Sequence, residues 1–188
     1  LVLDALAEAG CPAIVVTSHA ADEVTRAVEA RARLAVQAEP LGTGHAALAA
    51  REASGNAPRV LIVNADLPLV TAATLMHQHV ASRNVLTFLT THLEDPAGYG
   101  RVVRDRRAEG SPVLKIVEQT DADSATAAIN EVNVGLYAAD AGWLWPALEA
   151  VTPSPQGEVY LTSAIELAIL GGAPVGTCSV EASEAQQV

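Results

Sequence analysis

The chain has 188 residues, of which 50% are hydrophobic, 18% charged and 3% aromatic, and its formal net charge is −11 at pH 7. This length suits one domain, and the apolar content suits a packed core and excludes a disordered tail. The acidic balance argues against nucleic acid as a partner, because phosphate backbones are held by clustered Lys and Arg. No apolar run approaches about 18 residues, so no membrane span is predicted, and the start LVLDALAEAG resembles an amphipathic helix with acidic residues rather than a signal peptide. The sequence therefore indicates a cytoplasmic protein.

Helical and strand patterns alternate along the first half of the chain. Helical periodicity predicts helices over 1–9, 21–32, 43–53 and 71–82. Apolar runs predict strands over 13–18, 34–37, 59–66 and 85–91. Such alternation predicts an α/β fold with a Rossmann-like, mostly parallel sheet.

The second half begins with shorter β runs separated by polar turns. These runs cover 100–104, 113–119 and 130–139, and the first two flank a polar loop that predicts a hairpin. Helices over 141–150 and 160–170 and a strand within 172–180 follow. The sheet is therefore predicted to be mixed rather than purely parallel.

A Gly-Thr-Gly sequence stands at the start of the predicted helix at 43–53, in the segment QAEPLGTGHA (37–46). Ligands of open α/β sheets bind beyond the carboxyl ends of the strands, and glycine lets a planar base or a phosphate approach backbone N–H groups. Taken alone, the motif has another interpretation, in which Thr43 is an ordinary N-cap and the glycines only make the turn.

Asp66 follows the most hydrophobic predicted strand, in the segment NADLPLV (64–70). A carboxylate at the end of a central strand is well placed to hold Mg²⁺ against a phosphate, since hard cations prefer oxygen ligands. The alternative is a solvated turn residue that caps the next helix. The central position of the strand favours the metal interpretation.

Polar side chains also interrupt the later strands. Glu118 and Asn133 lie within apolar β runs, where burial is costly unless the polar groups are paired, so they are predicted to converge on a hydroxylated ligand. Tyr160 and Thr162 lie at the start of a predicted helix, and GYGR occupies 98–101. From spacing alone, a hydrogen-bonded loop network and a simple capping turn explain these residues equally well.

Six segments in order, QAEPLGTGHA, NADLPL, DPAGYGRVV, KIVEQ, NEVNVGLY and QGEVYLTS, resemble the uridylyltransferase domain of the bacterial bifunctional N-acetylglucosamine-1-phosphate uridylyltransferase / glucosamine-1-phosphate acetyltransferase family. The resemblance covers nearly the whole chain and implies the three-layer fold of nucleotide-diphospho-sugar transferases. It implies Mg²⁺-dependent transfer of UMP from UTP to N-acetylglucosamine 1-phosphate, which gives UDP-N-acetylglucosamine and pyrophosphate for peptidoglycan precursor synthesis.

The resemblance also implies roles for individual residues. The nucleotide site would comprise Gln37, Gly42, Thr43, Asn64 and Asp66, with uracil held by the first three and Mg²⁺ by the last. The sugar-phosphate site would comprise Gly100, Glu118, Asn133, Tyr160 and Thr162. No general base is required, because a sugar phosphate is already ionised, and positioning and charge neutralisation then suffice.

The chain departs from the family pattern in several places. Relative to the family, 1–188 is predicted to be a partial nucleotidyltransferase domain, lacking the first βα unit with its Gly-rich loop, a second metal-binding Asn and the acetyltransferase domain. Ala65 replaces a Gly and Ser163 an Asp. We therefore expect little or no activity from this chain alone.

Two other functions stay open at this point. Whether the parent protein is a homo-oligomer also stays open. The chain could be another sugar-phosphate or cofactor nucleotidyltransferase, although the LGTGHA segment argues against a thymidylyl- or guanylyltransferase. It could instead be a degenerate domain that binds nucleotide without turnover.

Overall fold

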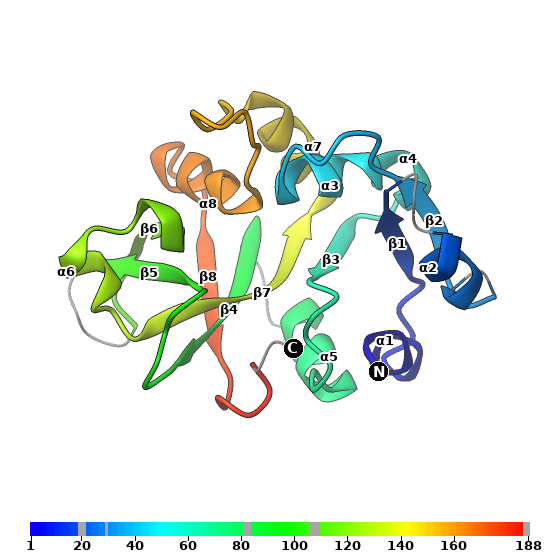
Figure 1. The fold of residues 1–188 in the computed structure, drawn as a ribbon, viewed down its shortest axis with the longest axis horizontal. Helices are drawn as coiled ribbons and strands as arrows, with labels where there is room; N and C mark the ends of the chain where they lie inside the picture. Colours follow the sequence, from blue (N-terminus) through cyan, green and yellow to red (C-terminus); the bar gives the residue numbers. More distant parts are fainter. Residues whose placement is uncertain (19–21, 29, 81–83, 106–109, 186–188) are drawn as a thin grey trace.

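A computed structural model describes residues 1–18, 22–28, 30–80, 84–105 and 110–185 (Figure 1). Its strands are β1 (Ile14–Thr17), β2 (Arg33–Val36), β3 (Arg59–Val63), β4 (Leu86–His92), β5 (Gly100–Arg104), β6 (Val113–Val117), β7 (Glu131–Asp140) and β8 (Val175–Ser179). Its helices are α1 (Val2–Glu8), α2 (Asp22–Val28), α3 (Thr43–Ala49), α4 (Arg51–Ser54), α5 (Ala72–Val80), α6 (Ser124–Ala127), α7 (Ala141–Ala150) and α8 (Leu161–Leu170), with a 3₁₀ turn η1 (Gln119–Asp121).

Six strands form the main sheet, and β1 and β2 form a separate parallel pair. In the main sheet β7 runs antiparallel to β3, β4 and β5, while β8 runs parallel to β4 and β6 runs antiparallel to β5. Four strands, β3, β4, β5 and β8, therefore share one direction, and β7 and β6 oppose it. The predicted mixed α/β sheet is confirmed.

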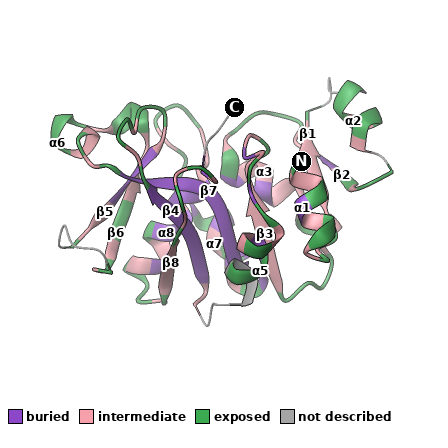
Figure 2. Cartoon of the chain, turned by 90° about the horizontal axis from the view of Figure 1, so that it is seen from below, coloured by how far each residue is buried: buried purple, intermediate pink, exposed green. Residues whose placement is uncertain are grey.

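The long strand β7 organises this sheet because it is buried on both faces. Nine of its ten residues are buried, which matches the nearly continuous apolar run expected of a strand covered on both sides (Figure 2). Its first part pairs with β5 through Val132 and Asn133, and its last part pairs with β3 from Leu136 onward. The change of partner falls at Gly135, which has a φ of 85°.

Helices cover both faces of the sheet and form two apolar cores. On one face, α3, α7 and α8 pack on Phe88, Tyr137 and Ala139. On the other, α1 and α5 pack on Leu89 and Leu136. Figure 1 shows these two groups of helices on opposite sides of the strands. The predicted three-layer arrangement is confirmed.

The element boundaries differ from the predictions in a few places. The predicted helix over 43–53 is divided into α3 and α4 at Ala50, and neither α6 nor η1 was expected. Parts of the predicted helices over 21–32 and 71–82, and of the predicted hairpin loop, lie outside the described residues. Within the described ranges, no helix is long and apolar enough to cross a membrane.

A buried ion pair joins three strands at one end of the sheet. Arg104 donates from Nε and Nη2 to the two carboxylate oxygens of Glu131, at 2.7 and 2.6 Å, and from Nη2 to Thr177 Oγ1 at 3.1 Å. The side chains of Arg104 and Glu131 are only 8% and 11% exposed. Burial raises the pKa of Glu131, but hydrogen bonds from Arg104 and its charge outweigh burial and hold that pKa below 4.5.

We expect Glu131→Gln to lower the free energy of unfolding at pH 7 by about 3 kcal/mol, because it leaves a buried guanidinium without its counter-charge. A carboxylate with a depressed folded pKa stabilises the fold at higher pH, and this contribution is lost as the pH falls through the folded pKa. The difference between wild type and variant should therefore be constant well above pH 4.5 and shrink below it. Urea unfolding from pH 7 to pH 3 measures both effects.

The matched control is Glu149→Gln, because Glu149 pairs with Arg51 at the surface, where both side chains are about half exposed. Surface pairs contribute about 0–1 kcal/mol, so this variant should barely change the stability. Equal losses in the two variants would contradict the importance of the buried pair.

Candidate functional site

The change of strand partner at Gly135 brings the ends of β3 and β5 together along β7. A Cβ at Gly135 would overlap the side chain of Asn64, and the Asn64 N–H donates to the Gly135 carbonyl at 3.0 Å. Gly100 of β5 pairs with Asn133 just before this point. Asn64 from the predicted nucleotide site therefore lies beside Gly100 and Asn133 from the predicted sugar site, at the kind of strand switch where α/β sheets bind ligands.

Backbone contacts fasten the glycine loop to the segment before α8. The Val159 N–H donates to the Leu41 carbonyl, and the Gly44 N–H donates to the Val159 carbonyl, each at 2.8 Å. Gly42 has a φ of 95°, and a Cβ there would lie 2.6 Å from the Val159 oxygen. We call these contacts between residues 41–44 and 159–161 the clasp, and only glycine at position 42 permits so close an approach.

Thr43 takes part in the clasp through its side chain. Its Oγ1 accepts a hydrogen bond from the Leu161 N–H at 3.0 Å, which satisfies one of the free N–H groups at the start of α8. The N-cap of α3 is Gly42 rather than Thr43. The alternative in which Thr43 is an ordinary N-cap of its own helix is therefore wrong, because its hydroxyl caps a different helix.

Gln37 is oriented by two hydrogen bonds. Its Nε2 donates to the Gly42 carbonyl at 3.1 Å and lies 3.0 Å from Nδ1 of His45. Since the amide nitrogen has two hydrogens, Nδ1 of a neutral His45 can accept the second. Both donors of Gln37 are then used, and Oε1 has no partner within the described part of the chain.

Asp66 lies three residues after the end of β3 and carries an open oxygen. Its Oδ1 is buried and has no hydrogen-bond partner among the described residues. Those residues contain no group of three or more His, Cys, Asp or Glu side chains that could hold a metal by themselves. A single orphaned carboxylate oxygen fits Mg²⁺, which usually binds one or two carboxylates, several waters and substrate phosphates.

The predicted sugar residues converge on Glu118. Thr162 Oγ1 donates to Glu118 Oε1 at 2.7 Å, and a Cβ at Gly100 would lie 3.3 Å from Glu118 Oε2. Asn133 is the register partner of Gly100. The structure therefore brings together four of the five residues that the sequence indicated for the sugar phosphate.

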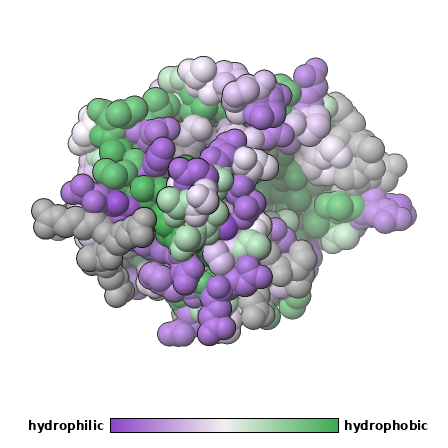
Figure 3. Space-filling view, turned by 60° about the vertical axis from the view of Figure 1, so that its left-hand side comes forward, coloured by the Kyte–Doolittle hydropathy of each residue, from purple (hydrophilic) through white to green (hydrophobic). Residues whose placement is uncertain are grey.

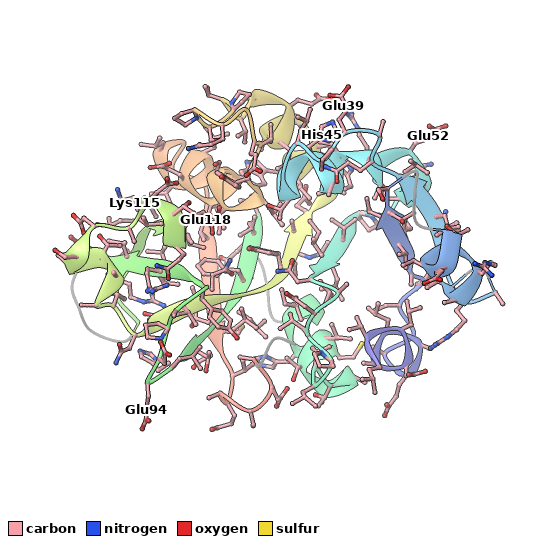
Figure 4. The ribbon with its side chains drawn as sticks, in the orientation of Figure 1. Glu39, His45, Glu52, Glu94, Lys115 and Glu118 are labelled. Atoms are coloured by element: carbon pink, nitrogen blue, oxygen red, sulfur yellow. The ribbon has the colours of Figure 1, made fainter. Side chains whose placement is uncertain are left out.

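The fifth residue, Tyr160, lines a cavity of about 310 Å³ with Glu118 and Thr162. A hydrogen bond with Glu158 raises the pKa of Tyr160, so this hydroxyl is protonated near neutral pH. Lys115 is the one basic residue among the described residues that line this cavity. Figure 4 labels Lys115 and Glu118 on the β6 side of the molecule, and hydrophilic atoms cover much of the face drawn in Figure 3.

Three residues of the site were not predicted from the sequence. His45 orients Gln37, Arg101 is only 2% exposed and donates to Gln119 Oε1 at 2.8 Å, and Tyr137 accepts a hydrogen bond from Asn133. The period of a β-strand places Asn133 and Tyr137 on one face, so that pairing had a signal in the sequence. The Arg101 contact joins separate segments, and the contact between Gln37 and His45 depends on how the loop between them folds, so neither had a signal in the sequence.

The three-layer α/β fold and the open carboxylate after β3 suit a nucleotide-binding transferase, and comparison with known families shows which family this is. The family model described as nucleotidyl transferase matches residues 1–182. The chain therefore belongs to the nucleotidyl transferase family.

Its curated relatives include proteins named "Bifunctional protein GlmU". The one from Pelotomaculum thermopropionicum is 42% identical over 186 residues, which cover 96% of this chain and 40% of the relative. The one from Anaeromyxobacter dehalogenans is 44% identical over 187 residues, which cover 94% of this chain and 38% of the relative. The chain thus spans about two fifths of the length of these relatives.

A solved structure supports the fold. It is a crystal structure of a UDP-glucose pyrophosphorylase complexed with UDP-glucose, with a TM-score of 0.64 and 17% identity. The match covers 93% of this chain and 75% of that chain. At this identity the likeness supports the fold alone.

We expect Gly42→Ala to lower the free energy of unfolding by about 2–4 kcal/mol, because the residue must keep a positive φ and its Cβ meets the Val159 oxygen. Relief of the clash would separate the clasp and weaken the uridine nucleotide binding that is proposed below. Urea unfolding and calorimetric titration with UTP measure the two effects.

Gly172→Ala is the matched control, because Gly172 has a φ of 68° and nothing lies within 4 Å of a Cβ there. It should cost only the backbone strain, about 1–2 kcal/mol, and leave nucleotide binding unchanged. The clasp would lose its assigned importance if both variants lost the same stability and bound UTP equally well.

Proposed function

We propose that this chain carries the site for transfer of UMP from UTP to N-acetylglucosamine 1-phosphate, which gives UDP-N-acetylglucosamine and pyrophosphate. The observation that carries the proposal is the clasp. It fastens the loop that bears Gly42 and Thr43 to the start of α8. This part of α8 supplies Tyr160 and Thr162 to the cavity of about 310 Å³ beside Glu118, which we call the sugar cavity. Two substrate sites held against each other in this way suit a reaction that depends on positioning.

The state of Gln37 supports uracil as the base. With both amide hydrogens directed to Gly42 and His45, Gln37 presents an acceptor, Oε1. Uracil carries an N–H donor at N3, which can donate to Oε1 of Gln37. Cytosine carries an acceptor at N3, and two acceptors facing each other repel. Gly42 and Thr43 would offer backbone groups to the same base.

The cluster around Glu118 supports a hydroxylated sugar. Glu118 is an acceptor, Asn133 supplies both an amide donor and an amide acceptor, and Thr162 already donates to Glu118. A sugar with neighbouring hydroxyl and acetamido groups presents complementary donors and acceptors. Unpaired polar groups in such a site strongly disfavour ligands that lack these partners.

The reaction needs charge neutralisation more than proton transfer. An oxygen of the sugar phosphate attacks the α-phosphorus of UTP, a new P–O bond forms, and the bond to the β-phosphate breaks to release pyrophosphate. Asp66 would hold Mg²⁺, which supplies positive charge for the phosphates. Acidic residues outnumber the single Lys115 around the sugar cavity, so a metal ion also suits the local charge.

The setting of this activity is also proposed. The product would feed peptidoglycan precursor synthesis, and both substrates are small soluble molecules. We further propose that the chain by itself has little or no turnover. A decisive assay therefore uses a chimera in which residues 1–188 replace the matching segment of the Pelotomaculum thermopropionicum relative.

We expect this chimera to release pyrophosphate from UTP only when N-acetylglucosamine 1-phosphate and Mg²⁺ are present. Asp66→Asn should lower its turnover by at least about 100-fold, because the remaining amide binds the cation weakly. Glu52→Gln is the control, since Glu52 is an exposed residue of α4. Unchanged turnover in Asp66→Asn would remove Asp66 as the metal ligand, and nucleotide binding without turnover in the unsubstituted chimera would favour a non-catalytic domain.

The base preference gives a second prediction. His45→Leu removes the acceptor that holds one Gln37 hydrogen, so this N–H becomes free to donate to N3 of cytosine. The ratio of the UTP and CTP dissociation constants should move toward one by about tenfold, the worth of one hydrogen bond. His77→Leu, on the exposed side of α5, should leave the ratio unchanged. An unchanged ratio in His45→Leu would contradict this role of His45.

A further inference from the structure

Tyr137 is a core residue with a polar end inside the sugar site. It lies on β7 and is 4% exposed, and its ring packs on Phe88 with centroids 6.4 Å apart and planes tilted by 36°. Phenylalanine would fill the same apolar space. The difference between tyrosine and phenylalanine is the hydroxyl, and a buried hydroxyl needs a hydrogen-bond partner. The role of the Tyr137 hydroxyl therefore depends on that partner.

The partner of the Tyr137 hydroxyl is Asn133. Nδ2 of Asn133 donates to this hydroxyl at 2.6 Å, and Oδ1 of Asn133 accepts from the Gly135 N–H at 3.2 Å. A backbone N–H can only donate, so Oδ1 must face Gly135 and Nδ2 must face Tyr137. The two contacts together allow one orientation of the amide, which leaves one N–H and one lone pair for a ligand.

The chemistry of Tyr137 makes it a steady acceptor. Burial raises its pKa above the ordinary value of 10.0, the hydrogen bond from Asn133 opposes this to a smaller extent, and the negative charge of Glu118 raises it further. The hydroxyl therefore stays neutral near neutral pH.

We propose that Tyr137 is a positioning residue of the sugar-phosphate site, whose hydroxyl fixes the amide of Asn133 so that its second N–H meets an acceptor oxygen of the sugar. The inference rests on the proposed function, because the ligand of Asn133 is the sugar phosphate proposed above. Tyr137 itself lies behind Asn133 and acts through it.

The test is Tyr137→Phe, which keeps the ring and removes the acceptor of one Asn133 hydrogen. Calorimetric titration of this chain should show the dissociation constant for N-acetylglucosamine 1-phosphate raised about tenfold, the worth of one hydrogen bond, with that for UTP unchanged. In an Asn133→Ala background, the same substitution should no longer change sugar-phosphate affinity. In the chimera, KM for the sugar phosphate should rise more than kcat falls.

Thr91→Val is the matched control, because it removes a different buried hydroxyl, which donates to the Val180 carbonyl at 2.8 Å. It should leave sugar-phosphate affinity unchanged. An equal loss of affinity for UTP, or an undiminished effect of Tyr137→Phe in the Asn133→Ala background, would overturn the inference and leave Tyr137 as core packing.

A second readout separates this inference from the proposed function. The side-chain amide signals of Asn133 in ¹H–¹⁵N spectra should shift and exchange faster with solvent in Tyr137→Phe but not in Thr91→Val, with or without ligand. If wild type binds no sugar phosphate, the proposed function fails while these signals still decide the orientation of Asn133. Unchanged signals in Tyr137→Phe would overturn the positioning role.

Discussion

The contact between Gly42 and Val159 is the constraint on which the rest of the site depends. Two backbone hydrogen bonds of 2.8 Å and the cap that Thr43 gives to α8 hold two segments together that are more than a hundred residues apart in sequence. The Val159 carbonyl occupies the space that any side chain at position 42 would need. Because the loop at 41–44 and the start of α8 are joined directly, the spacing between the proposed base and sugar sites is set before either substrate binds.

Two buried guanidinium groups of the central sheet are committed to structure. Arg104 is paired with Glu131, and Arg101 is held by Gln119 and the carbonyls of Tyr99 and Ala127. These buried guanidinium groups brace the strands and the loop that carries Gly100. Because they are already satisfied, the phosphates of a nucleotide would need another source of positive charge. Because these arginines are not available to phosphates and the net charge of the chain is −11, a metal ion at Asp66 is the favoured source of positive charge.

Strand and helix order could be predicted because each element has its own periodic pattern. β7 is an example, since its run of buried residues and its polar Asn133 are visible in the sequence. The division of the predicted helix at Ala50 could not be predicted, because alanines on both sides of it favour a continuous helix. The pairing of Gln37 with His45 also depends on how a loop folds back, which residue spacing does not specify.

One face of β7 explains why a polar row can be buried in this core. Glu131, Asn133 and Tyr137 lie on the same face of the strand because they are separated by even numbers of residues. Glu131 pairs with Arg104, and Asn133 and Tyr137 form a hydrogen bond with each other. The opposite situation holds at Asp66, whose Oδ1 is buried and unpaired within the described residues. A buried carboxylate oxygen without a partner is costly unless a ligand completes it. The buried and open oxygen of Asp66 therefore supports the proposal that a cation and the phosphates meet there.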